Sequence, residues 1–302
     1  MASGIQDQWA QWVLRRGHGG DPEQQQRVFA DLYPVRERVL QNARIAEGEV
    51  LLDVGAGNGL IAFRALDQVG PHGKVIFSDI SQDLLDHCQA LAQQIDALDR
   101  CQFLRLPADD LFALGAASVD VVTTRSVLIY VAAKQQAFQE FYRVLKSNGR
   151  LSIFEPINNY FRPRPNQPKE FWGFDVTPIA DLVAKIDTVY RRVQPSETSP
   201  LLDFDDHDLV TFAQEAGFAD IHLELQVHVV PGAWHNNWQA FVHTAPNPCV
   251  PTLAEAMQAA LTSDEAERLT TYLCPLVEAE QGTKRYAWAY LWAIKPADAN
   301  DE

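Results

Sequence analysis

The sequence lacks long apolar runs and a cationic start, and both absences bear on where the protein works. Within its 302 residues, no stretch approaches the roughly 20 consecutive apolar positions that a membrane helix needs. The first residues also contain no basic segment followed by an apolar block, which is the pattern of a secretory signal. We therefore expect a cytoplasmic protein without a membrane partner.

Positive charge is scarce as well. The chain has 25 Lys and Arg residues against 40 Asp and Glu residues, which gives a formal net charge of -15. Nucleic-acid binding draws most of its affinity from clustered Lys and Arg side chains. The charge balance therefore predicts no nucleic-acid partner and favours a small-molecule substrate, and it leaves a homodimer open.

Cysteine is rare and scattered. The four cysteines are Cys88, Cys101, Cys249 and Cys274, with no CxxC pair among them. This spacing argues against structural zinc and gives no disulfide framework. The eight histidines contain no pair at metal-ligand spacing. We therefore predict reduced, mostly buried thiols and no metal.

What the sequence does contain is an alternation of short apolar strands and amphipathic helices. A buried strand starts at Val50, and further strands are predicted at 74–79, 100–107, 119–126, 149–156, 221–229 and 286–294. One helix is expected from the N-cap Ser81 to Ile95, and another over 134–145, ending at the Asn148-Gly149 turn. This order predicts an α/β fold: a Rossmann-like, doubly wound, seven-stranded sheet, mostly parallel with an antiparallel last strand.

After residue 156 the pattern changes to cap insertions. Three prolines lie between residues 162 and 168, and helices are predicted at 177–190 and 207–216. Two capping boxes, Thr252 with Glu255 and Thr262 with Glu265, predict two helices between the last two strands. The chain then divides into a helical cover (1–48), a core (49–230) with a cap insertion at about 157–200, a helical lid (231–284), and the last strand with its tail (285–302).

The run VLLDVGAGNG at 50–59 predicts a strand that ends in Asp53 and a glycine-rich turn. Glycines adopt positive φ and let the backbone come close to a ligand. The glycines fall as GxGxG, with Leu60 where a dinucleotide fingerprint needs glycine, and no P-loop GK[ST] sequence exists. Asp79 ends the next strand, where a carboxylate suits a ribose diol. These features indicate a ligand that carries a nucleoside.

These residues make the chain resemble the class I S-adenosylmethionine (SAM) dependent methyltransferases over residues 35–156. It is most similar to the bacterial small-molecule group that includes ubiquinone, menaquinone and arsenite methyltransferases. The resemblance implies SAM as cofactor and a small-molecule acceptor, such as a secondary metabolite or a quinone-like compound. It also implies the residues that hold the cofactor, which are Asp53, Gly55, Ala56, Gly57, Asn58 and Gly59 in the first motif, Asp79 at the ribose, Ile80, Ala108 and Asp109 at the adenine, Arg125 and Ser126 at the methionine moiety, and Tyr130 beneath it.

Methyl transfer from a sulfonium is an in-line displacement, so positioning is the main requirement and a base is needed only for some acceptors. Glu155, directly after the fifth strand, is the candidate base; the alternative is a carboxylate bonded to local backbone. His235 or His18 is a candidate contact to the acceptor, and each is otherwise an ordinary polar group. Three aromatic residues complete the predicted substrate side: Tyr33, which can face the sulfonium, and Trp234 and Trp238 in the lid.

Three other functions stay open. A SAM-binding protein can catalyse a different reaction, such as a cyclisation, or keep the fold and only bind a partner. An arsenite methyltransferase needs several cysteines around the metalloid, one of them near the first motif, because soft metalloids need thiolate ligands. This glycine loop contains no cysteine, and the nearest is Cys88.

Overall fold

The computed structural model describes residues 7–161, 169–196 and 198–297. The chain forms two compact units. The sheet unit comprises residues 32–157, 200–226 and 288–302, and the helical unit comprises residues 1–31, 158–199 and 227–287. The predicted division into cover, core, cap and lid is a different partition and stays a prediction.

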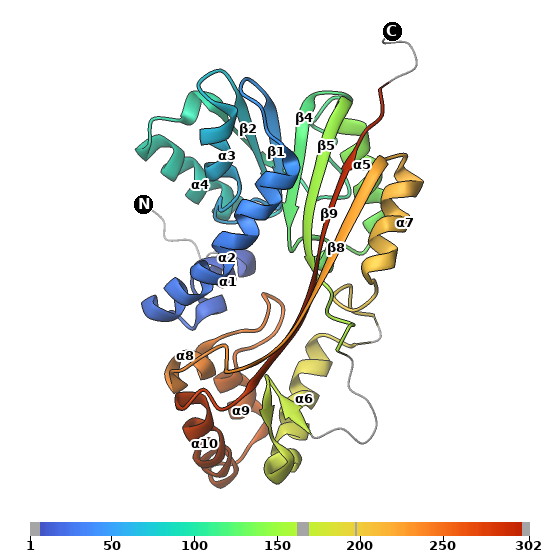
Figure 1. Ribbon diagram of the computed structural model, residues 1–302. Helices are drawn as coiled ribbons and strands as arrows, with labels where there is room; N and C mark the ends of the chain where they lie inside the picture. The colour runs from blue at the N-terminus through green and yellow to red at the C-terminus, as the bar shows by residue number, and fades with distance from the viewer. Residues whose placement is uncertain (1–6, 162–168, 197, 298–302) are drawn as a thin grey trace. The chain divides into compact units, whose positions relative to one another are not determined.

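Among the described residues, seven strands form one sheet in the order β3-β2-β1-β4-β5-β9-β8 (Figure 1). The strands are β1 (Val50–Val54), β2 (Lys74–Asp79), β3 (Cys101–Arg105), β4 (Val119–Arg125), β5 (Leu145–Pro156), β8 (Ala219–Pro231) and β9 (Thr283–Ile294). Neighbours from β3 to β5 pair in parallel, and β9 runs antiparallel to β5. The predicted Rossmann-like sheet is confirmed. Its strand order reverses between β1 and β4, where ligands of such sheets bind.

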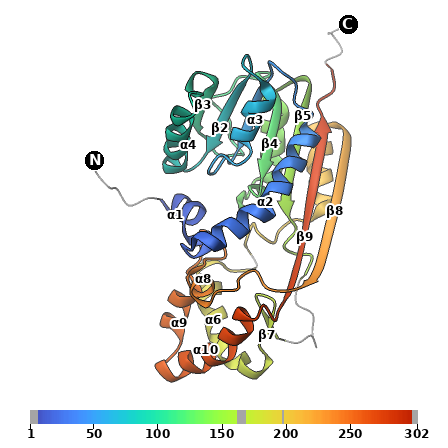
Figure 2. The same cartoon turned by 60° about the vertical axis from the view of Figure 1, so that its left-hand side comes forward.

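Helices cover both faces of this sheet (Figures 1 and 2). On one face lie α3 (Ala62–Val69), α4 (Gln82–Gln94) and the end of α2 (Pro22–Ala43), whose apolar residues share one core with β1 and β2. On the other face lie α5 (Lys134–Val144) and α7 (Asp206–Ala216), joined by the Phe138 and Phe212 rings at 5.8 Å. Sandwiching the strands between two helical layers buries them on both sides and holds their carboxyl ends in fixed register.

The helical unit has its own apolar core. Its elements are α1 (Gln8–Leu14), η1 (Arg16–His18), β6 (Glu170–Phe171), β7 (Phe174–Asp175), η4 (Thr177–Ile179), α6 (Ala180–Val193), α8 (Trp238–His243), α9 (Leu253–Ala260) and α10 (Ser263–Glu278). Both predicted capping boxes start their helices as expected. The prediction of two helices between the last strands was wrong, because the described residues contain a third, α8, which starts at the side-chain cap of Asn237 instead of a capping box.

Three local predictions need correction. The helix α5 ends at Val144 because Leu145 is already extended and pairs with Val119; Asn148 adopts φ of 62°, but inside β5, where the pairing register shifts. Ile95 caps α4 and is 59% exposed, so it does not extend the apolar stripe. On β8, Val229 is 56% exposed, so the predicted apolar face does not continue to the end of the strand.

The histidine side of β8 packs on aromatic side chains of β9. The ring of His222 stacks on Trp292 with centroids 5.0 Å apart, and the ring of His228 stacks on Tyr286 with centroids 4.7 Å apart. The proline-rich stretch at 162–168 lies outside the described residues. No helix within the described ranges is both long and apolar enough to span a bilayer.

Candidate functional site

The turn after β1 brings the backbone to the carboxyl edge of the sheet. Gly55, Gly57 and Gly59 have φ of 65°, 57° and 80°. A Cβ on Gly55 would lie 2.2 Å from the Val127 side chain, and one on Gly59 would lie 2.4 Å from the Phe63 ring. On Gly57, the nearest atom would be 3.9 Å away. The outer glycines are therefore required by protein packing, whereas Gly57 leaves room for a ligand.

Neighbouring backbone holds this turn in place. The Ala56 N–H donates to the Ser78 carbonyl at 2.9 Å, and the Gly59 N–H donates to the Ala56 carbonyl at 2.8 Å. Asn58 is half-buried within the turn. Below it, the Cys88 thiol of α4 donates to the Gly57 carbonyl at 3.3 Å. The loop is thus fixed before any ligand arrives.

Asp79 ends β2 beside this turn. Its Oδ2 accepts from the Gly57 N–H at 2.9 Å, and its Oδ1 accepts from the Ser81 N–H at 2.9 Å. The side chain is buried, yet it lies at the strand end next to the open Gly57. The geometry places a carboxylate where a diol can be bound.

The predicted adenine residues lie at the same edge. Ile80 follows Asp79 and is 43% exposed, an unusual value for an isoleucine beside a buried carboxylate. The Leu106 N–H donates to the Asp79 carbonyl at 3.1 Å, which brings the turn after β3 to this edge. That turn carries Ala108, which is buried, and Asp109, which is half-buried. The structure therefore brings together the apolar and acidic residues expected around an adenine.

Two buried carboxylates and a half-buried guanidinium lie where β1, β4 and β5 end. Burial raises the pKa of Asp53 to about 7, although its Oδ1 accepts from the Thr123 hydroxyl at 2.9 Å. Burial lowers the pKa of Arg125, opposed by the charges of Asp53 and Glu155. Such shifts are common at functional sites, because they reflect charges held away from water.

Glu155 anchors the turn that follows β4. Its Oε1 accepts from the Val127 and Leu128 N–H groups at 2.8 and 2.9 Å, and its Oε2 accepts from Ile129 at 3.3 Å. The residue is 0% exposed, and burial raises its pKa to about 7. This geometry favours the backbone-bonded alternative, in which Glu155 orients the turn that leads to η3 (Leu128–Tyr130).

Ser126 and Tyr130 belong to that same turn. Ser126 has φ of 56° and donates its N–H to the Phe154 carbonyl at 2.8 Å. Tyr130 is half-buried and close enough to Arg125 to affect its pKa. Both residues therefore lie with the glycine loop in the sheet unit, as predicted.

Both histidines predicted on the substrate side are buried in the helical unit. The His235 Nε2 lies 3.0 Å from the Thr244 hydroxyl oxygen, and burial lowers the pKa of the imidazole to about 4. The His18 Nε2 lies 3.1 Å from the Leu14 carbonyl. The Nδ1 of His18 is buried without a hydrogen-bond partner among the described residues. Contact with an acceptor stays a prediction for each histidine.

The three predicted aromatic residues differ in their surroundings. Trp238 packs against the core of the helical unit. Trp234, in the same unit, is partly exposed, with the Lys284 ammonium 5.0 Å from its ring. Tyr33, in the sheet unit, is exposed and has the Arg36 guanidinium 4.7 Å from its ring centroid. A role at a sulfonium or an acceptor stays a prediction for all three.

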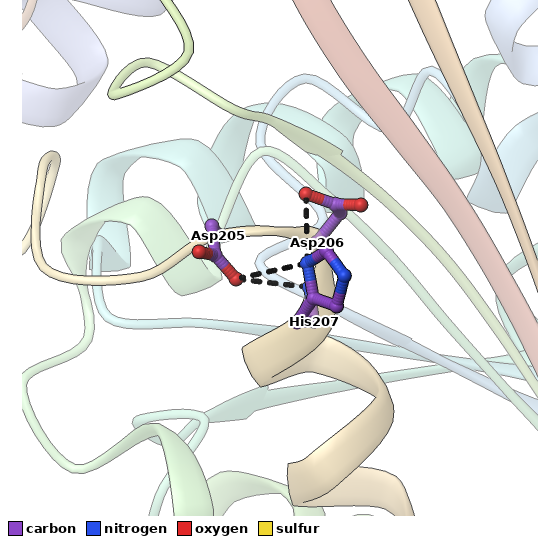
Figure 3. A group of neighbouring side chains, drawn as sticks. All are labelled: Asp205, Asp206 and His207. Atoms are coloured by element: carbon purple, nitrogen blue, oxygen red, sulfur yellow. Dashed lines mark hydrogen bonds and ion pairs between the residues drawn. The ribbon is translucent and has the colours of Figure 1, made fainter.

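Asp205, Asp206 and His207 offer oxygen and nitrogen atoms within 4.8 Å of one another, at the start of α7 (Figure 3). Asp205 is the N-cap of this helix, and its Oδ1 accepts from the His207 and Asp208 N–H groups at 2.9 and 3.1 Å. Helix capping therefore explains the cluster, which gives no reason to assign a metal.

Thr123 is a site residue that sequence reasoning missed. It lies opposite Asp53 in the β1–β4 pairing and donates its hydroxyl to that carboxylate. The expected strand order could have found it. In this fold β1 and β4 are adjacent at the switch point, so residues near their carboxyl ends lie close together.

Known proteins share the sheet-unit sequence and the fold. The family model described as a methyltransferase domain matches residues 45–180. An arsenite methyltransferase of Halobacterium salinarum is 33% identical over 115 residues, which cover 38% of this chain and 29% of that protein. The ubiquinone/menaquinone biosynthesis C-methyltransferase UbiE of Cronobacter sakazakii is 26% identical over 59% of this chain and 69% of its own length.

A solved structure has a similar fold. The Haemonchus contortus phosphoethanolamine N-methyltransferase 2 in complex with S-adenosyl-L-methionine gives a TM-score of 0.50 at 15% identity, covering 95% of this chain and 56% of that one. At that identity the likeness concerns the fold alone. The family match over residues 45–180 and the relatives show that this part of the chain is similar in sequence to class I SAM-dependent methyltransferases.

Proposed function

We propose that the protein transfers a methyl group from SAM to a small-molecule acceptor, in the cytoplasm. One observation carries the proposal: Asp79 is hydrogen-bonded to Gly57, the one glycine of the loop that has open space above it. A buried carboxylate beside an open, positive-φ backbone suits a ribose that continues into a longer chain. When bound, SAM supplies an electrophilic methyl on a sulfonium.

The surrounding residues fit such a ligand. Asp79 would accept from the ribose hydroxyls, and the exposed Ile80 would pack against the adenine face. Asp109 would accept from the exocyclic amine, with Ala108 beside it. The backbone of Arg125 and Ser126 would lie along the methionine part, because Arg125 ends β4 at the switch point and Ser126 follows it.

Within this proposal, Glu155 positions the reaction centre instead of moving a proton. Its two oxygens hold three consecutive backbone N–H groups and face no solvent. Asp53 adds negative potential beneath the loop, which favours a cationic sulfonium over a neutral sulfur. An acceptor that loses its proton to water needs no further protein group.

Arsenite methylation is the alternative that a relative suggests, and the thiols argue against it. Burial raises the pKa of Cys88 to about 12 and that of Cys101 to about 11, so both stay protonated at neutral pH. Cys249 and Cys274, also with raised pKa values, belong to the other unit. Metalloid binding needs converging thiolates, which makes an organic acceptor the better proposal.

Isotope transfer tests the proposed reaction. The purified protein would be incubated with SAM carrying a deuterated methyl and a panel of phenols, quinols, amines and arsenite, followed by mass spectrometry. We expect a labelled methyl on an organic compound, and none with the Asp79→Ala variant. Conversion of a panel compound without label would instead support the cyclisation alternative, and label on arsenite would overturn the organic acceptor.

A further inference from the structure

Arg125 has unusually few partners for a half-buried arginine. Among the described residues its side chain makes one hydrogen bond, a long one from Nη1 to the Ser126 hydroxyl at 3.4 Å. No carboxylate in the described part of the chain lies within ion-pair distance of its guanidinium. A guanidinium carries five N–H donors, so most of the hydrogen-bonding capacity of this side chain is unused.

The two nearby carboxylates are committed elsewhere. Asp53 accepts from the Thr123 hydroxyl, and Glu155 accepts from three backbone N–H groups after β4. Both are close enough to act on the charge of Arg125, yet neither bonds it directly. Arg125 is therefore a cation at the end of β4 that forms no ion pair with either carboxylate.

The free donors of Arg125 are accessible. The side chain is half-buried, and its unbonded nitrogens are not among the fully buried polar atoms of the described residues. Other arginines of the sheet unit use their donors within the chain: Arg143 donates to both oxygens of Glu140 at 2.7 Å. Arg125 therefore offers free donors that a ligand can reach at the end of β4.

We propose that the Arg125 guanidinium binds a carboxylate of the ligand at the switch point. This rests on the proposed function and names a role for the side chain beyond its backbone. Arg125 ends β4, next to β1 in the sheet order, so it lies at the edge of the sheet where ligands of this fold bind.

The charge balance favours a planar monoanion over a phosphate. Asp53 and Glu155 lie on either side of Arg125, and their negative potential opposes a dianion. The two oxygens of a carboxylate can accept two parallel hydrogen bonds from a guanidinium, and the carboxylate carries a single negative charge. It can come from the amino-acid part of SAM or from an anionic acceptor.

Calorimetry with matched ligands separates these sources. S-adenosylhomocysteine carries the carboxylate, and 5′-methylthioadenosine keeps the adenosyl sulfur group without it. If the cofactor supplies the carboxylate, Arg125→Gln weakens S-adenosylhomocysteine binding by about tenfold or more and leaves 5′-methylthioadenosine binding unchanged. Arg125→Lys, which keeps the charge and loses the fork, gives an intermediate loss.

The second arm probes the acceptor side. Protein saturated with S-adenosylhomocysteine is titrated with benzoate and with benzamide. If the acceptor supplies the carboxylate, the wild type prefers benzoate, and Arg125→Gln abolishes that preference while its S-adenosylhomocysteine affinity stays intact. If Arg125→Gln does not fold, the same titrations on Arg125→Lys are decisive.

Two results overturn the proposal. One is that Arg125→Gln leaves the affinities for S-adenosylhomocysteine and benzoate unchanged. The other is an equal loss for S-adenosylhomocysteine and 5′-methylthioadenosine, which would mean that Arg125 only supports the adenosyl site. A wild type that binds neither nucleoside would instead refute the proposed function.

Discussion

The N–H of Gly57 donates to Oδ2 of Asp79 at 2.9 Å, which ties the turn after β1 to the end of β2. The second carboxylate oxygen holds the N–H of Ser81, the N-cap of α4. One side chain therefore fixes the glycine loop and the start of a helix. Under the proposed function, a change at Asp79 would alter both loop geometry and ligand binding.

Substitution of Gly55 should destabilise the sheet unit through a clash as well as backbone strain. An alanine Cβ there would lie 2.2 Å from Val127 at a φ of 65°. We expect Gly55→Ala to lower the free energy of unfolding by about 2–4 kcal/mol. Urea denaturation followed by circular dichroism measures the change.

Gly48 supplies the matched control for this loss. It also has positive φ, at 86°, but a Cβ there would meet nothing within 4 Å. Gly48→Ala should therefore cost only the strain of the backbone, about 1 kcal/mol. Equal losses at the two positions would contradict the packing of the loop against Val127.

The affinity for SAM should rise with pH relative to that for S-adenosylhomocysteine. Asp53 has a pKa of about 7 because it is buried, so it loses its proton between pH 6 and 8. A deprotonated carboxylate favours the cationic sulfonium and acts less on a neutral sulfur. We expect the affinity ratio to rise about threefold to tenfold across this range, and to stay flat in Asp53→Asn.

Calorimetry of both ligands at pH 6, 7 and 8 checks this expectation. Glu155 titrates over the same range, so the Asp53→Asn variant is needed to assign the effect. A ratio that does not change with pH in the wild type would show that the sulfonium lies away from Asp53.

Replacing Glu155 should affect stability in proportion to the lost hydrogen bonds. Glutamine keeps one acceptor for the Val127 and Leu128 N–H groups, whereas alanine removes all three bonds. We expect losses of about 1 kcal/mol for Glu155→Gln and about 3 kcal/mol for Glu155→Ala. Methyl transfer by Glu155→Gln should stay within a few-fold of the wild type; an unchanged stability with abolished turnover would identify a base instead.

His235 should make the protein sensitive to acid. Burial lowers its pKa to about 4, whereas the imidazole of an unfolded chain titrates near about 6.5. Between these values the unfolded chain binds a proton that the folded protein excludes, so stability falls as pH drops, by about 1.4 kcal/mol per pH unit.

His235→Gln should remove this part of the acid sensitivity, because glutamine does not titrate. His72→Gln, at an exposed position of the sheet unit, is the control and should change nothing. Thermal melts at pH 4.5, 5.5 and 7 measure the difference between the variants. A parallel pH dependence of the wild type and His235→Gln would contradict the burial of a neutral imidazole.

Much of the fold and the arrangement of the glycine loop could be predicted because both depend on local signals. Glycine spacing, the acidic strand ends and the N-cap Ser81 lie within a few residues of the structure that they determine. The predicted turn at Asn148 also formed, but its place in β5 depends on pairing with β4, which is not local information.

Long-range contacts explain what the sequence could not show. The stacking of His228 on Tyr286 joins residues that are distant in the chain, so the sequence did not show which side of β8 is covered. The Thr244 partner of His235 lies at the other end of α8, so the loop sequence alone left His235 open as a contact to the acceptor. The three backbone bonds of Glu155 depend on a turn formed after a different strand.

The binding of S-adenosylhomocysteine to the wild type and to Asp79→Ala, measured by isothermal calorimetry, tests the account most directly. The control is Asp86→Ala, which removes an exposed carboxylate from α4 close to the site. We predict that the wild type and the control bind equally and that Asp79→Ala loses at least about tenfold in affinity. No binding by the folded wild type, or equal binding by all three proteins, would contradict a nucleoside held between Gly57 and Asp79.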